Sequence, residues 1–262
     1  MFKPIVPFGG LQGWNFLNRT LAAQEEIFAK QPNLLRDVDY FLENISNIET
    51  AEQLVGDRRL LRVTLGAFGL SDDLDNKFFI RKVLEDGTAS PDALANRLSD
   101  RRYRRLSNAI GLGFVAGGNL AKPGFADQII SRFQRNQFEN AIGEIDTSFR
   151  AALSFSNGLG EIVNFNKSNN ARWFAIMGDP PIREVVQTAL GLPKSIAKID
   201  LDQQLEAFKT KSKAAFGTDV VADILNPDVT ETVIRRYLVR NASDQSSNFS
   251  SASTALALLR AI

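Results

Sequence analysis

The chain has no cysteine and no histidine among its 262 residues. Without cysteine there can be no disulfide, no thiolate nucleophile and no cysteine-ligated zinc or iron–sulfur site. Without histidine, the commonest general base and the commonest side-chain ligand of transition metals are both missing. We therefore expect no catalytic, cofactor-binding or metal-binding residues. An enzyme of unknown reaction that works through Asp, Glu, Lys, Ser or Tyr stays open as an alternative.

Net charge and long apolar runs are also scarce. Lys and Arg total 31 against 30 Asp and Glu, so the net charge of +1 gives no overall field to attract nucleic acid or an anionic membrane. No stretch approaches the roughly eighteen consecutive apolar residues of a membrane-spanning helix, and residues 1–10 lack the apolar core of a cleaved secretory signal. These absences predict a protein that is cytoplasmic or exported without a cleaved signal. Neither a membrane nor nucleic acid is expected as its main partner.

What the sequence does contain is the apolar spacing of helices. Between residues 125 and 155 the apolar residues recur mostly at three- and four-residue steps, with charged residues between them. Thr50 and Gln53 have the spacing of a capping box, and Asp57 and Asp179 each precede a further apolar stripe. No segment alternates apolar and polar residues as a half-buried strand does. The sequence therefore predicts an all-α protein, a helical bundle of about ten helices.

The longest apolar stripe sets the predicted domain organisation. Residues 123–156 are interpreted as a long central helix, punctuated by Pro123 and Gly124 at its start and by Gly158 just after its end. This helix would join two similar sub-bundles, residues 1–122 and residues 157–241. Residues 242–262 are predicted to form a flexible serine-rich tail with an apolar end.

Two segments echo each other across the predicted halves. Residues 60–70 end in Ala-Phe-Gly-Leu, and residues 182–192 end in Ala-Leu-Gly-Leu. Further along, Leu98-Ser99-Asp100 before an arginine- and tyrosine-bearing helix resembles Leu225-Asn226-Pro227-Asp228 before Arg235-Arg236-Tyr237. Glycines that close helices are common, so duplication and chance are both compatible with this match.

The densest positive cluster consists of Arg101, Arg102, Arg104 and Arg105. Together with Tyr103, these side chains could hold a phosphate or an RNA backbone. A structural role is the other interpretation, because Asp100 offers a carboxylate for ion pairs and arginine stems pack over aromatic surface. The cluster is therefore a candidate anion-binding site, and an RNA- or phosphate-binding protein is an alternative function.

The candidate protein-interaction site is the apolar carboxyl-terminal end, with Leu256, Leu258, Leu259 and Ile262. It follows residues 243–254, which are almost wholly Ser, Asn, Gln, Asp and Ala. Linkers have this kind of composition. An apolar end on a polar tether must dock on the core of this protein or on another chain, and the sequence leaves both open.

Two further motifs are weaker. Residues 111–116, Gly-Leu-Gly-Phe-Val-Ala, fit a dinucleotide-binding fingerprint, but they follow an arginine-rich helix where that fingerprint requires a strand, so a linker is favoured. Asp72, Asp73 and Asp75 form an acidic run without the glycine and distal glutamate of a calcium loop. We interpret Asp73 as a helix cap.

Five stretches of the chain together resemble one bacterial family. They are MFKPIVPFGGLQGWNFLNRTLAAQ at residues 1–24, DRRLLRVTLGAFGLSDDLDNKFFIRKVLEDG at 57–87, LANRLSDRRYRRLSNAIG at 94–111, RWFAIMGDPPIREVVQTALGLP at 172–193 and LDQQLEAFK at 201–209. The family is the domain of unknown function 1217, whose members are often encoded among flagellar genes in alphaproteobacteria. The resemblance covers most of residues 1–240. It implies that the protein belongs to the flagellar system, and it identifies no catalytic residue.

The residues and the resemblance together favour a non-enzymatic, flagellum-associated protein. It would act through protein–protein contacts, as an export or assembly factor or as a minor exported component. The expected partner is a protein of the flagellar system, and no cofactor is expected.

Overall fold

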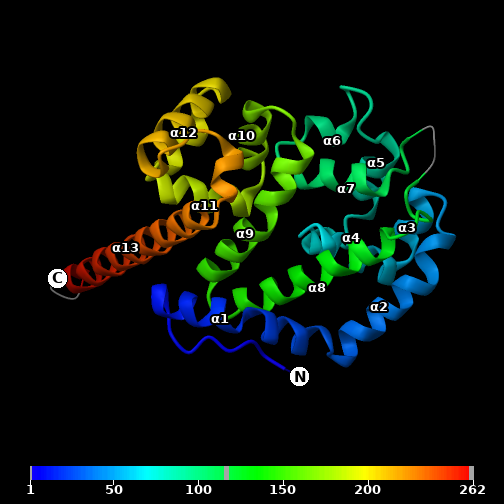
Figure 1. Ribbon diagram of the computed structural model, residues 1–262, viewed down its shortest axis with the longest axis horizontal. Coiled ribbons are helices and arrows are strands. Elements are labelled where there is room, and N and C mark those ends of the chain that lie inside the picture. The colour runs from blue at the N-terminus through cyan, green and yellow to red at the C-terminus, as the bar shows by residue number, and fades with distance from the viewer. Residues whose placement is uncertain (1, 115–117, 260–262) are drawn as a thin grey trace. The chain divides into compact units, whose positions relative to one another are not determined.

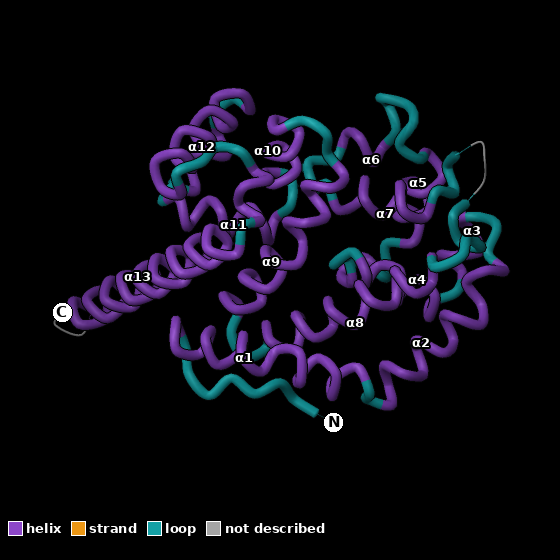
Figure 2. Tube along the Cα trace, viewed as in Figure 1, coloured by secondary structure: helices purple, strands orange, loops and turns teal. Residues whose placement is uncertain are grey.

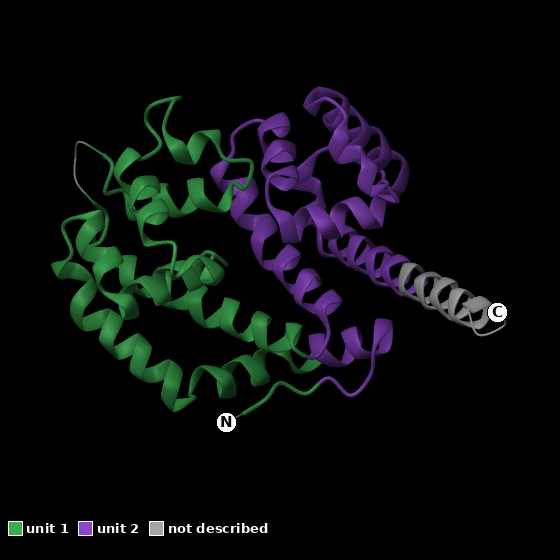
Figure 3. Ribbon diagram, turned by 180° about the vertical axis from the view of Figure 1, so that it is seen from behind, with its two compact units in different colours: residues 1–5, 19–144 green, residues 6–18, 145–262 purple. Residues whose placement is uncertain are grey.

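The computed structural model describes the backbone of residues 2–114 and 118–259, and side chains up to Ser243. Over these residues the chain forms helices and connecting loops without any strand (Figure 2). The predicted all-α class is confirmed, since eleven of the thirteen α-helices in this part of the chain have seven residues or more. The chain divides into two compact units: residues 1–5 with 19–144, called unit 1, and residues 6–18 with 145–262, called unit 2 (Figure 3).

Unit 1 is built from helices around α4, and α1 runs across its boundary with unit 2 (Figure 1). The helices are α1 (Gly10–Ala29), α2 (Pro32–Asn44), α3 (Ala51–Gly56), α4 (Arg58–Ala67), α5 (Lys77–Asp86), α6 (Leu94–Arg97), α7 (Arg102–Ile110) and α8 (Phe125–Gly143). Two 3₁₀ turns, η1 (Ile45–Asn47) and η2 (Ser71–Asp73), lie between them.

Helix α4 is the centre of unit 1. Leu60, Leu61 and Leu65 on α4 are buried, and the helix packs against α2, α3 and α8. Its amino end is capped by Asp57, whose Oδ1 accepts the backbone N–H groups of the next turn, as the sequence predicted. Because nearly every apolar side chain of α4 is buried, this helix contributes strongly to the stability of unit 1.

Unit 2 is likewise built from helices around a central one. They are α9 (Thr147–Phe165), α10 (Asn169–Met177), α11 (Pro180–Leu190), α12 (Leu201–Phe216) and α13 (Pro227–Leu259), with 3₁₀ turns η3 (Lys194–Lys198) and η4 (Val221–Leu225). Helix α11 is the central one and packs against α9, α10 and α13. Its amino end is capped by Asp179, and Pro180 occupies the first helical position, where no N–H is needed.

The two central helices share the same structural plan. Both are closed by a glycine with a φ of 68°, Gly69 after α4 and Gly191 after α11. In both, the backbone N–H of the following leucine, Leu70 or Leu192, bonds back five residues, at 2.9 Å and 3.0 Å. Counting from the capping aspartates, the segments 57–70 and 179–192 therefore correspond residue by residue. The echo seen in the sequence is an equivalence of structure.

The single helix predicted over residues 123–156 is wrong, because two helices occupy this stretch. Helix α8 ends at Gly143 and α9 begins at Thr147. Between them Asp146 adopts an extended conformation, and its Oδ1 accepts the N–H of Ser148 at 2.8 Å. The sequence Asp-Thr-Ser starts a new helix here, with Asp146 as its cap. The predicted stop at Ser156 is also passed, because Leu159 and Ile162 continue the buried stripe.

The tail predicted as flexible over residues 242–262 is helical through Leu259, as part of α13. No glycine or proline follows Pro227, so nothing in the sequence terminates the helix, and serine, alanine and asparagine are all tolerated in it. Three side chains of the candidate interaction site, Leu256, Leu258 and Leu259, lie outside the described side chains. Ile262 lies outside the described residues altogether.

Candidate functional site

The arginine cluster lies in unit 1, on and just before α7. Arg102 has a structural role: its guanidinium pairs with Asp100 at 2.7 Å and donates to the main-chain oxygen of Gly69 at 2.5 Å. This contact ties α7 to the carboxyl end of α4, where a positive charge is favourable. The adjacent Tyr103 donates its hydroxyl to Asp73 at 2.6 Å, and burial raises the pKa of this phenol. The structural interpretation therefore applies to Arg102.

Arg101 and Arg104 are different. The guanidinium of Arg101 donates to the main-chain oxygen of Asn96 at 3.3 Å. Burial lowers the pKa of Arg101, and the nearby charge of Arg104 lowers it further. The Nε of Arg104 is buried without a hydrogen-bond partner. Among the described residues, no carboxylate forms an ion pair with either side chain, so two like charges face one another at the positive end of a helix.

A second cationic surface, which the sequence did not indicate, lies in unit 2. It is a groove of about 630 Å³ along α11, lined among others by Arg183, Gln187, Thr188, Lys194 and Arg240. We call it the α11 groove. Its volume lies in the range of pockets that hold small ligands or peptide side chains.

Arg183 is the most firmly held side chain of the α11 groove. Its guanidinium donates to the main-chain oxygen of Met177 at 3.1 Å, to Gln187 at 3.1 Å and to Gln204 at 2.8 Å. It also lies over the ring of Phe208, 5.8 Å from the centroid. All of these partners are neutral, and burial lowers the pKa of Arg183. The geometry therefore fixes a positive charge in place without neutralising it.

The other cations of the groove are at the far end of α11. The guanidinium of Arg240 lies directly over Gly191, so closely that a Cβ at this glycine would collide with it. The neighbouring Arg236 has a different task, because its Nε donates to the main-chain oxygen of Ala189 at 3.2 Å and so caps α11. Glu184 is the one acidic residue that lines this groove in the described part of the chain, and it accepts the hydroxyl of Tyr237 at 3.2 Å.

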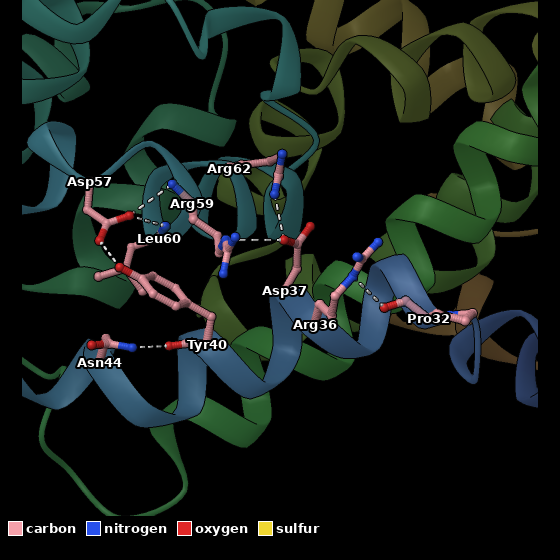
Figure 4. A network of polar contacts seen from close by, with 9 residues as sticks. All are labelled: Pro32, Arg36, Asp37, Tyr40, Asn44, Asp57, Arg59, Leu60 and Arg62. Atoms are coloured by element: carbon pink, nitrogen blue, oxygen red, sulfur yellow. Dashed lines mark hydrogen bonds and ion pairs between the residues drawn. The ribbon is translucent and has the colours of Figure 1, made fainter.

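A polar network of unit 1 joins α2 to the start of α4 (Figure 4). Tyr40 donates its hydroxyl to the capping carboxylate of Asp57 at 2.7 Å, and the guanidinium of Arg59 stacks 4.5 Å from the centre of the Tyr40 ring. Asp37 pairs with Arg62 at 2.5 Å in the same network. Asp37 lies near both Arg59 and Arg62, and Arg36 donates to the main-chain oxygen of Pro32 at 3.2 Å, so these side chains are used in contacts within the protein, which favours a structural role.

The weaker motifs take structural roles as well. Gly111 closes α7 in a left-handed conformation, and no strand precedes it, while Val115 and Ala116 lie outside the described residues. Gly113 approaches the backbone of Gly87 so closely that any side chain would be excluded. Asp73 does not cap a helix as predicted, because its two carboxylate oxygens hold Tyr103 and Asn76.

In the part of the chain that the structure describes, no three His, Cys, Asp or Glu side chains come together as a set of metal ligands. None of the helices in the same part combines the length and the apolar character needed to cross a membrane.

Comparisons with known proteins address the family and the fold. A family profile described as "Protein of unknown function (DUF1217)" matches residues 67–229. The crystal structure of a protein from Agrobacterium tumefaciens is similar over 91% of this chain and 97% of that chain, with a TM-score of 0.73 and 23% sequence identity. At this identity the likeness shows a common fold. None of the curated proteins compared with the chain matches it.

Proposed function

Because the chain belongs to the DUF1217 family of proteins of unknown function, we propose that it is a non-enzymatic protein of the flagellar system that acts by binding another protein. The flagellar setting comes from the resemblance to this family. The proposal that it binds another protein is supported by an apolar surface of unit 1 that is exposed to solvent.

That surface is the outer face of α2. Leu35 is 40% exposed and Leu42 is 46% exposed, and their spacing of seven residues places them on the same side of the helix. Phe78, at the start of α5, is 83% exposed. Single exposed apolar residues are ordinary, but two leucines at i and i+7 have the spacing of the anchors by which a helix binds a partner. The leucine pair on α2 is the observation that carries the proposal.

Two measurements test this function together. Deleting the gene should reduce swimming and flagellar assembly, and the intact gene should restore both. The double variant Leu35→Lys with Leu42→Lys should fold normally and fail to restore them, because the apolar anchors are replaced by solvated charges. Asn33→Lys is the matched control, since it adds a charge to another exposed position of the same helix. Normal swimming without the gene would remove the flagellar proposal.

A second candidate function is binding of RNA or a phosphate group by the arginine cluster. The pair Arg101 and Arg104 favours it, because neither is neutralised by a carboxylate of the described residues. Binding of a short single-stranded RNA should fall when both are replaced by alanine and should weaken steeply as salt rises. Arg97→Ala removes an exposed arginine next to the cluster and should have little effect. RNA binding that survives the double replacement would exclude this site.

A further inference from the structure

The equivalence of the two central helices shows where unit 2 departs from unit 1. Four residues after the capping aspartate, α4 has Leu61, which is fully buried, and α11 has Arg183. Four residues further, Leu65 of α4 is also buried, and Gln187 stands in its place on α11. Unit 2 thus replaces two core leucines by a cation and an amide that holds it.

The contacts of Arg183 join α11 to Met177 of α10 and to Gln204 of α12, but all of these partners are neutral, so the charge itself is left unneutralised. At the equivalent position of α4, Leu61 is buried without bringing in a charge. Arg183 lies near the amino end of α11, where the helix dipole disfavours a positive charge, and it has no carboxylate partner among the described residues. Departures of this kind from local rules are typical of functional sites.

The charges of the α11 groove are spread along the helix. Arg183 and Gly191, over which Arg240 lies, are eight residues apart, which corresponds to about 12 Å at 1.5 Å per residue. Lys194 is at the same end as Arg240. Three cations and the single acid Glu184 leave the described lining with a charge of +3 − 1 = +2.

This separation along the backbone favours an extended anionic ligand over a compact one. A single phosphate is only a few ångströms across and is short compared with about 12 Å of helix. Two carboxylates on an extended peptide, four residues apart, are about 13 Å apart. Guanidinium groups bind carboxylates strongly and in a defined geometry. The apolar Pro180 and Leu192 in the lining offer contacts for the side chains between the two acids.

We propose that the α11 groove binds an acidic peptide segment of a partner protein, with one carboxylate on Arg183 and another on Arg240 about four residues away. This inference rests on the proposed function, because it names the chemistry of a protein partner. It concerns a surface of unit 2, whereas the leucine pair on α2 belongs to unit 1, so the two can fail separately.

The test uses the full chain and synthetic probes. The first probe is an acetylated heptapeptide with two glutamates four positions apart, the second is its isomer with adjacent glutamates, and the third is inorganic phosphate. Binding is measured by titration calorimetry at low salt. The variants are Arg183→Leu, which installs the residue that unit 1 has at Leu61, and Arg240→Gln. The control is Arg235→Gln, an exposed arginine of α13 that does not line the groove.

The spaced peptide should bind at least tenfold more tightly than its isomer or phosphate. Either groove variant should weaken it at least tenfold, while the control should bind like the natural protein. Arg183→Leu should keep the helical circular dichroism of the natural protein. If it does not, Arg240→Gln tests the groove independently.

Three results would overturn the inference: no binding of the spaced peptide at millimolar concentration, equal binding of both peptides, or unchanged binding by both groove variants. Tighter binding of phosphate than of either peptide would replace the peptide by a phosphate ligand. None of these results would affect the swimming test.

Discussion

The cap of α4 gives the sharpest prediction about stability. Asp57 accepts the N–H groups of Arg59 and Leu60 at 2.9 Å and 3.0 Å, so two of the unpaired donors at the start of the helix depend on one carboxylate. Asp57→Ala removes both bonds and the anchor for Tyr40. Losing an N-cap side chain costs about 1 kcal/mol, with a range of about 0.5–2 kcal/mol. We expect a value in the upper half of this range, because α4 is the central helix of unit 1.

The assay must report on unit 1 alone, since two compact units need not unfold together. Hydrogen exchange at the amides of α4 does so, alongside urea denaturation of the whole chain. Asp57→Asn is the matched variant, because asparagine caps about as well as aspartate and should cost less than about 0.5 kcal/mol. If Asp57→Ala left the exchange of α4 unchanged, or if Asp57→Asn were equally damaging, the carboxylate would not be acting as a cap.

Three further predictions test packing and electrostatics. Gly66→Ala should destabilise unit 1 by about 1–3 kcal/mol, because a Cβ there would lie 2.7 Å from the buried ring of Phe133. Gly160→Ala should instead stabilise α9 by up to about 1 kcal/mol, because no atom lies within 4 Å of the added Cβ. Thermal unfolding measures both effects. Equal effects of the two alanines would contradict the packing of α4 on α8. Ser107→Ala should cost about 1 kcal/mol in urea denaturation, because its buried hydroxyl donates to a main-chain oxygen of α5 at 2.9 Å, and no change would show that this bond contributes nothing. Desolvation raises the pKa of Asp57, but hydrogen bonds from backbone N–H groups and a tyrosine hydroxyl outweigh it and hold that pKa below its usual value. The stability contributed by the ionised carboxylate should therefore be complete above about pH 5 and be lost as the pH falls below about 3.9. An acid unfolding curve that Asp57→Ala leaves unaltered would refute this prediction.

Local signals in the sequence predicted much of the fold. The capping box of Thr50 with Gln53 and the caps at Asp57 and Asp179 all form as expected, because each satisfies backbone groups within its own turn. The break at Asp146 was missed although its cap motif was present, because the apolar stripe continues on both sides of it. Periodicity shows which face is buried and does not show whether the backbone is continuous.

The α11 groove was not predicted because its cationic lining comes from residues that only the tertiary structure brings together. Arg183 in the sequence is one charged residue on an amphipathic helix. Its neutral partners Met177 and Gln204 belong to α10 and α12, which only the fold brings close to it. One signal was available: extending the echo back to the capping aspartates pairs Arg183 with Leu61. The arginine cluster, by contrast, was found from composition alone, but the sequence did not separate the structural Arg102 from Arg101.

The central claim is that binding occurs where unit 2 departs from the plan that both units share. The most direct measurement follows the arginine Nε–H signals of the ¹⁵N-labelled protein by NMR while the peptide with spaced glutamates is added. The account predicts that the signals of Arg183 and Arg240 shift together with increasing peptide, while those of Arg101 and Arg104 stay in place. Shifts confined to Arg101 and Arg104, or no shift at any arginine, would contradict it.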